Sequence, residues 1–213
     1  MKVFKNADGK PVLFAMVKVI QENKEYLGEI DGLIGDGDHG MNMNKGFSLF
    51  EERYKNKNFT FTEGLDGLGT ILFSEIGGSM GPIYGSFLCG TAEAGKGYDG
   101  IGVNELTKMF KTGLDELCDI VEAKVGDKTL IDSLQPSIDS LSLSVENNHS
   151  FVLALENMIK AAEKGRDSTK NLQAKFGRSS RLGERSIGVL DAGATSCCLI
   201  LVAIATSMLD NIQ

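Results

Sequence analysis

The chain has 213 residues, which suits a single domain, and its 42% of hydrophobic residues are enough for a full core and too many for a disordered chain. Its net charge of −7 argues against a nucleic-acid partner and against binding to anionic lipid. A polyphosphate ligand would therefore need metal ions to supply much of the positive charge.

Helical periodicity dominates the sequence, and almost no alternating strand pattern is visible. The expected helices run from Pro11 to about Gly28, over Gly40–Tyr54, Thr62–Ser74 and Met80–Ala94, from an N-cap at Asn104 to about Val121, over Thr129–Leu143, from an N-cap at Ser150 toward Lys175, and over Ala192–Met208. About eight helices predict an all-α fold.

Four cysteines, Cys89, Cys118, Cys197 and Cys198, form no CxxC pair and show no zinc spacing. The polar residues 1–10 do not resemble a secretory signal. These features predict reduced, buried thiols in a cytoplasmic protein.

The closing apolar run, Ala192–Met208, is at the short limit for a membrane span. It contains two threonines and two serines, and no basic flank follows it. We therefore expect a buried core helix and no membrane partner.

The most informative segment runs from Asp31 to Gly40 and contains three aspartates among several glycines. Its GxGxxG match is weak, because an acidic helix end precedes it and not a buried strand. An EF-hand is excluded, because neither register places Glu at the twelfth loop position. Gly90–Lys96 resembles a Walker A loop, but Gly97 stands where Ser or Thr must ligate the metal.

Asp31, Asp36 and Asp38 supply the hard carboxylate ligands that Mg²⁺ prefers. A helix begins directly after them, and its free amide groups suit a phosphate. These features favour a cradle for a Mg-bound nucleotide. The alternative, a solvated acidic turn with capping aspartates, stays open on the spacing alone.

Three further segments fit such a site, and each also has a purely structural interpretation. Gly77–Gly85 offers a second anion-binding helix start with Ser79, or a close helix crossing. Gly177–Ser186 concentrates three arginines that suit phosphate, or forms a solvated loop. Asp191 caps the closing helix or touches a nucleotide, and Gly126–Thr129 is a turn in which Asp127 and Thr129 serve as caps.

Together these segments resemble the nucleotide-binding L subunits of dihydroxyacetone kinase (DhaL) over essentially the whole chain. The matching stretches are Ile34-Gly-Asp-Gly-Asp-His-Gly-Met-Asn42, Gly77-Gly78 with Gly81-Pro82, Gly126-Asp-Lys-Thr129, and Leu182-Gly-Glu-Arg-Ser-Ile-Gly188 with Asp191, Gly193 and Ala194-Thr-Ser196.

The resemblance implies an eight-helix antiparallel barrel, one DhaL-like nucleotide-binding domain over residues 1–213, with the nucleotide at one end. It implies two Mg²⁺ ions bridged by Asp31, Asp36 and Asp38 and an ADP or ATP cofactor. The implied nucleotide contacts are His39, Gly40, Met41, Asn42, Ser79, Met80, Val121, Leu130, Arg178, Asp191, Ala192 and Gly193. No catalytic residue is assigned with certainty, and Arg178 is the candidate phosphate stabiliser.

The resemblance also implies a function in a phosphoenolpyruvate-dependent dihydroxyacetone kinase. The nucleotide would relay a phosphoryl group from an M subunit (DhaM) to dihydroxyacetone held on a K subunit (DhaK), and the chain could also pair as a homodimer. One alternative is a subunit of an ATP-dependent kinase for dihydroxyacetone or a related ketose. Another is a nucleotide-loaded regulatory module, motivated by Ser79-Met80 where the family tends to have Ala-Ser.

Overall fold

The structure is a computed structural model that describes residues 2–212. Within this range the chain forms eight α-helices, three 3₁₀ helices and one pair of two-residue strands. In chain order these are β1 (Phe4–Lys5), η1 (Asn6–Asp8), α1 (Gly9–Ile34), α2 (His39–Tyr54), α3 (Phe61–Glu75), α4 (Met80–Ala94), β2 (Gly100–Ile101), α5 (Val103–Cys118), α6 (Ile131–Glu146), α7 (Phe151–Ser168), η2 (Thr169–Asn171), η3 (Arg178–Ser186) and α8 (Ala192–Asp210).

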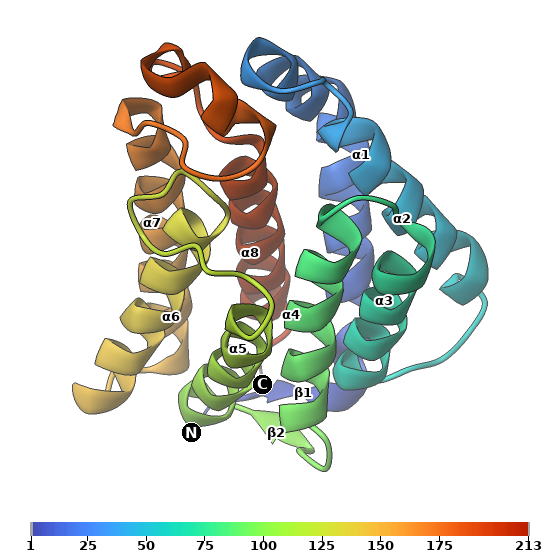
Figure 1. Cartoon of the computed structure of the whole chain (residues 1–213). Helices are drawn as coiled ribbons and strands as arrows, with labels where there is room; N and C mark the ends of the chain where they lie inside the picture. The colour runs from blue at the N-terminus through green and yellow to red at the C-terminus, as the bar shows by residue number, and fades with distance from the viewer. Residues whose placement is uncertain (1, 213) are drawn as a thin grey trace.

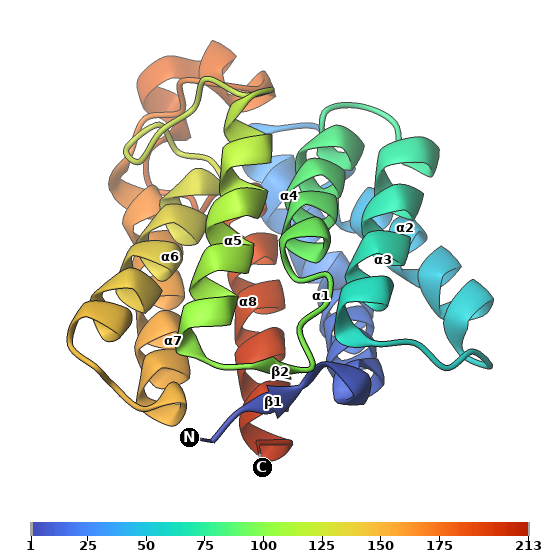
Figure 2. The same cartoon turned by 90° about the horizontal axis from the view of Figure 1, so that it is seen from below.

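The eight α-helices form a closed ring in chain order. Each helix packs against the next one, and α8 closes the ring by packing against α1. Figure 1 shows the helices side by side, and Figure 2 shows the ring from below. The predicted all-α fold and its eight-helix antiparallel arrangement are confirmed. The short antiparallel pairing of Phe4 with Ile101 is the one departure within the described residues, and it ties the start of the chain to the start of α5.

The up-and-down order of the helices decides where a site can form. Because consecutive helices are antiparallel, the junctions α1–α2, α3–α4, α5–α6 and α7–α8 all lie at the same end of the ring (Figure 1). The three connections α2–α3, α4–α5 and α6–α7 lie at the other end of the ring. The segments singled out in the sequence fall in the first group, so the topology alone brings them together.

Several helix ends differ from the predicted ones. The first helix continues to Ile34, because Gly28 does not end it but gives room for the carbonyl oxygen of Gly37. Asn104 is not the N-cap of α5; Gly102 is, and its amide donates to the Glu105 carboxylate at 2.9 Å. Ser150 caps α7 as predicted, accepting from the amide of Leu153 at 3.2 Å, but α7 ends at Ser168.

The closing helix α8 is, within residues 2–212, the one helix long and apolar enough to cross a membrane. In the fold, 67% of its most apolar 18-residue window is buried inside the protein. It packs against α7, α6 and α1. The prediction of a buried core helix is therefore confirmed.

The thiol prediction holds only in part. All four cysteines are free, and Cys197 and Cys198 are buried in α8. Cys118 is exposed and Cys89 is half-buried, so the expectation that all four are buried is wrong. Cys118 is the last residue of α5 and so lies at the end of the ring where the α5–α6 junction lies.

The close approach of α4 and α5 generates a stability prediction at Gly113. A Cβ atom there would lie 2.2 Å from Thr91 Oγ1 and 2.5 Å from the carbonyl oxygen of Phe87. We expect Gly113→Ala to lower the free energy of unfolding by about 1–3 kcal/mol, because the helix backbones must move apart. Urea unfolding followed by circular dichroism measures this value.

The matched control is Gly77→Ala, because a Cβ at Gly77 would have no atom within 4 Å. It should change the free energy of unfolding by less than about 0.5 kcal/mol. Equal stability of the two variants would contradict the packing described here.

Candidate functional site

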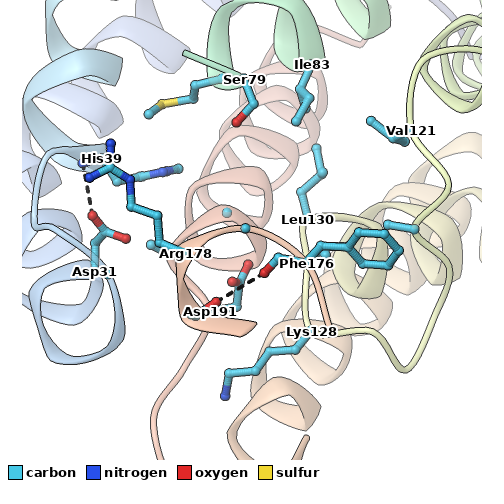
Figure 3. Close-up of a pocket in the computed structure, with 18 of the residues that line it drawn as sticks. Asp31, His39, Ser79, Ile83, Val121, Lys128, Leu130, Phe176, Arg178 and Asp191 are labelled. Atoms are coloured by element: carbon cyan, nitrogen blue, oxygen red, sulfur yellow. Dashed lines mark hydrogen bonds between the residues drawn. The ribbon is translucent and has the colours of Figure 1, made fainter. Parts of the chain in front are cut away.

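A pocket of about 640 Å³ lies at the end of the ring where the four junctions meet. All four junctions contribute side chains to it (Figure 3). Its lining includes Asp31, Asp36, Asp38, His39, Ser79, Met80, Ile83, Tyr84, Val121, Lys128, Leu130, Phe176, Arg178, Asp191, Ala192 and Gly193. The pocket is thus built from segments that lie far apart in the chain, with Asp31 and Gly193 separated by 162 residues.

The three aspartates predicted as metal ligands form a cluster at the α1–α2 junction. One carboxylate oxygen from each of Asp31, Asp36 and Asp38 lies within 4.8 Å of the others. Asp31 lies in the last turn of α1 and not in the loop, because the helix continues to Ile34. Its carbonyl oxygen accepts from the amide of Gly35 at 2.5 Å, and the helix ends at Gly35, whose own backbone is no longer helical.

The cluster concentrates negative charge. Burial raises the pKa of Asp31, and the charges of Asp36 and Asp38 add to this rise. The amide of His39, which donates to Asp31 Oδ2 at 3.4 Å, partly offsets it. Across the pocket, the Arg178 guanidinium forms an ion pair with Asp36 Oδ2. The residue types and spacing therefore fit a divalent cation with oxygen ligands.

Three expected nucleotide contacts, Gly40, Met41 and Asn42, do not line the pocket. Gly40 instead faces α1, where a Cβ would lie 1.8 Å from the carbonyl oxygen of Lys24. This contact lets α2 start close beside α1 and keeps the aspartates together. Met41 is 75% exposed to solvent. In this structure Gly40 packs against α1 and Met41 lies at the surface, and the contacts of Gly40, Met41 and Asn42 with a nucleotide stay a prediction.

His39 belongs to a buried hydrogen-bonded chain behind the cluster. Its Nε2 lies 2.7 Å from Ser196 Oγ, which in turn lies 2.6 Å from the Tyr84 hydroxyl. Tyr84 donates to the carbonyl oxygen of Gly193 at 3.1 Å. Burial lowers the pKa of His39 to about 4, so the ring is neutral near pH 7. These hydrogen bonds link α2, α4 and α8 at the pocket and hold the start of α8 in place.

The opposite side of the pocket is apolar. Figure 3 shows Val121, Leu130 and Phe176 on this side, away from Asp31 and His39. Ile83 of α4 also lines the pocket, and Ser79 starts α4 with no capping bond from its hydroxyl. The cavity therefore has one anionic side and one apolar side, which suits a ligand with a charged part and a flat hydrophobic part.

The floor of the pocket is formed by the start of α8. Asp191 is the N-cap, and its carboxylate accepts from the amide of Ala194 at 2.7 Å, as one of the two predicted roles requires. Burial raises the pKa of Asp191 to about 6. Lys128 lies beneath it and is buried.

Some pocket residues were not predicted from the sequence. Lys128, Tyr84 and Phe176 line the pocket but were not among the expected contacts. Lys128 and Tyr84 lie inside motifs that pointed to the site, so a signal existed for them. In the Gly126–Thr129 turn, Thr129 Oγ1 accepts from the amide of Ile131 at 3.2 Å, but the N-cap of α6 is Leu130, so Thr129 is not the predicted cap. The carboxylate of Asp127 instead accepts from Lys124 and pairs with Lys175, and it is Asp132 that binds the turn amides of Gly126 and Thr129.

Comparisons with known proteins agree on one family. The sequence profile of the DAK2 domain matches residues 33–206. The ADP-binding subunit DhaL of the PEP-dependent dihydroxyacetone kinase of Escherichia coli (strain K12) is 40% identical over 190 residues, which cover 88% of this chain and 90% of that protein. The L-erythrulose kinase of Pectobacterium atrosepticum is 33% identical over 88% of this chain, which corresponds to 32% of that enzyme.

The fold is also similar to a solved structure. The dihydroxyacetone kinase of C. freundii superposes with a TM-score of 0.70 and 22% sequence identity, over 92% of this chain. This chain spans about a third of the length of that kinase, matching 33% of it. At this identity the likeness concerns the fold.

The buried carboxyl of Asp191 generates a pH prediction for the metal-free protein. Its raised pKa means that the folded protein keeps a proton between about pH 4 and 6 that the unfolded chain has released. Rising pH therefore costs folded-state stability through this group. Asp191→Asn removes the cost and keeps the cap, so its advantage over the wild type should grow by about 1–3 kcal/mol across this window.

Thermal unfolding in EDTA at several pH values measures this difference. The control is Asp210→Asn, which removes one exposed carboxyl at the other end of the same helix. A pH-independent difference between Asp191→Asn and the wild type would show that Asp191 is ionised at its ordinary pKa.

Proposed function

Because the chain belongs to the DAK2 domain family, we propose that it is the ADP/ATP-binding subunit of a phosphoenolpyruvate-dependent dihydroxyacetone kinase. The observation that carries this proposal is the cluster of three aspartate carboxylates within 4.8 Å, set opposite an apolar wall in one cavity. The E. coli relative that aligns over most of both chains is named as the ADP-binding subunit of such a kinase. We expect residues 1–213 to act as one nucleotide-binding domain in the cytoplasm.

Asp31, Asp36 and Asp38 would hold two Mg²⁺ ions. Three carboxylates supply hard oxygen ligands that lie close enough together to share cations, and the number of two ions follows from the resemblance to DhaL subunits. Mg²⁺ held there would supply positive charge that offsets the negative charge of the phosphates during phosphoryl transfer. With the ions in place, a protein of charge −7 can accept a polyphosphate at this end.

The rest of the pocket would orient the nucleotide. The apolar side, with Val121, Leu130 and Phe176, suits the base. The start of α8 from Asp191 to Gly193, with His39, Ser79 and Met80, suits the ribose and phosphates. Arg178 lies across the mouth and would stabilise charge on a transferred phosphate.

Neither histidine in the described residues 2–212 is placed as a base for a sugar hydroxyl. Of the chain's two histidines, His39 is buried in the network with Ser196, and His149 lies in the α6–α7 connection at the opposite end of the ring. We therefore place the sugar on a K subunit (DhaK) and the source of the phosphoryl group on an M subunit (DhaM). The chain would hold the nucleotide between the two transfers, alone or as a homodimer.

One alternative is favoured by a specific observation. The L-erythrulose kinase of P. atrosepticum is 33% identical over most of this chain. The chain would then serve an ATP-dependent kinase for dihydroxyacetone or a related ketose and exchange its nucleotide in each cycle.

The metal assignment predicts the effect of removing one carboxylate. Asp36→Asn and Asp38→Asn should each lower the rate of dihydroxyacetone phosphorylation at least about 100-fold, because metal charge stabilisation supplies several kcal/mol. The assay combines the variant with K and M subunits, and circular dichroism checks the helical fold. Asp210→Asn, which changes the net charge equally, should keep the wild-type rate. Wild-type rates for the two site variants would refute the metal assignment.

Whether the protein keeps ADP bound or exchanges its nucleotide distinguishes the two kinase hypotheses. The phosphoenolpyruvate-dependent reading predicts that ADP is released when the purified protein is denatured, and that an M subunit phosphorylates this ADP while it is bound. Chromatography of the released nucleotide measures both. Protein that purifies without nucleotide and turns over only with added ATP would favour the ATP-dependent kinase.

A further inference from the structure

Lys128 is a buried lysine whose backbone is strained. Its exposed fraction is 1%, and no other lysine or arginine within residues 2–212 is counted as buried. Its φ of 61° lies in the left-handed region, where a lysine is uncommon and a glycine or asparagine fits at lower cost. Burial also lowers the pKa of its ammonium, which opposes its charge. Both costs indicate that the side chain has a specific task.

The ammonium of Lys128 joins two segments that are distant in sequence. It donates to the carbonyl oxygen of Thr169 at 2.7 Å and to that of Val189 at 2.5 Å. The first carbonyl belongs to η2, just after α7, and the second to the segment that leads into α8. Thr169 adds a further bond, because its hydroxyl oxygen accepts from the amide of Asp191 at 3.0 Å.

These contacts connect two walls of the pocket. Lys128 lies two residues before Leu130, which lines the apolar wall, and Val189 lies two residues before Asp191, which begins the floor. The walls are in contact, since a Cβ at Gly193 would lie 3.5 Å from the Leu130 amide nitrogen. Figure 3 shows Lys128 below Asp191 and Leu130 above it. One side chain therefore fixes both the Leu130 wall and the α8 floor.

We infer that Lys128 is a positioning residue for the nucleotide. Its bonds to the carbonyl oxygens of Thr169 and Val189 hold those two segments against the Gly126–Thr129 turn and so set the spacing between Leu130 and Asp191–Gly193. The inference rests on the proposed function, because the ligand it concerns is the nucleotide. Lys128 itself does not need to touch that ligand. Its charge also faces Asp191 and Asp132, and both carboxylates favour the charged ammonium.

Lys175 provides a matched comparison within the same region. Its ammonium pairs with Asp127 at 2.6 Å, so it also joins the 126–130 turn to the segment after α7. Its side chain is 58% exposed, and within residues 2–212 its ammonium pairs with Asp127 and not with the segment that leads into α8. If Lys128 only held the Gly126–Thr129 turn against the segment after α7, its substitution should have the same effect on ligand binding as substitution of Lys175.

The test compares Lys128→Met with Lys175→Met by three measurements. Calorimetry gives the Kd for Mg-ADP, electron paramagnetic resonance gives the Kd for Mn²⁺ alone, and carbon NMR of the aspartate carboxyls follows Asp191 without ligand. Lys128→Met should weaken Mg-ADP binding about tenfold or more, equivalent to about 1.4 kcal/mol. Mn²⁺ binding should stay within about twofold, and the Asp191 pKa should rise further because a cation has been removed.

Lys175→Met should leave all three values close to those of the wild type. If Lys128→Met does not fold, Lys128→Gln takes its place, because an amide can still donate to one carbonyl and should give a smaller loss. Unchanged Mg-ADP binding in the folded variant would overturn the inference, as would an equal loss of Mn²⁺ binding, which would mean general disruption. Failure of the wild type to bind Mg-ADP would instead refute the proposed function, while the Asp191 measurement would still test the contact with Lys128.

Discussion

The α1–α2 junction holds three carboxylates, those of Asp31, Asp36 and Asp38, within 4.8 Å of one another. Like charges at such distances repel by about 1 kcal/mol per pair in water and by more where water is partly excluded. The fold imposes this arrangement through rigid elements. Asp31 is fixed in the last turn of α1, and Gly40 lets α2 begin against the backbone of α1. Arg178 offsets one of the charges, and a divalent cation is the natural partner for the others.

The remainder of the site follows from the ring topology. An up-and-down ring gathers alternate junctions at one end, and each junction there supplies a different chemistry. The α1–α2 junction gives carboxylates, α3–α4 a free serine hydroxyl, α5–α6 an apolar wall, and α7–α8 an arginine with a helix start. The buried contacts between His39, Ser196 and Tyr84, and those of Lys128, hold these pieces in register. The pocket is built from four separate junctions, and the contacts that hold these junctions together are buried.

The fold class and the acidic cluster were accessible from sequence because both depend on local patterns. Apolar spacing of three and four residues marks helices, and three aspartates within eight residues are bound to lie close together whatever the helix boundaries are, although this spacing alone also fits a solvated acidic turn. Helix ends were harder to predict. Gly28 was interpreted as a stop signal, but it serves close packing against the returning loop. Asn104 was chosen as a cap on residue type, whereas the Glu105 side chain satisfies the amide of Gly102.

The supporting contacts could not be predicted because they are long-range. His39 and Ser196 are 157 residues apart, and nothing local to either indicates the other. Lys128 was assigned only to the Gly126–Thr129 turn, and because lysine is rarely buried, its burial was not expected. Gly40, Met41 and Asn42 were expected at the nucleotide only through the resemblance to DhaL subunits. Because a helix turns successive side chains by about 100°, their positions at the start of α2 differ, with Gly40 against α1 and Met41 at the surface.

The central claim is that the aspartate cluster and the apolar wall bind opposite ends of one metal-bound nucleotide. Crystals grown with ADP and Mn²⁺ test this directly, because anomalous diffraction at the manganese edge locates the ions independently of the rest of the density. We expect two manganese peaks beside Asp31, Asp36 and Asp38, with the base against Val121 and Leu130. Manganese peaks elsewhere, or a nucleotide bound outside this pocket, would contradict it.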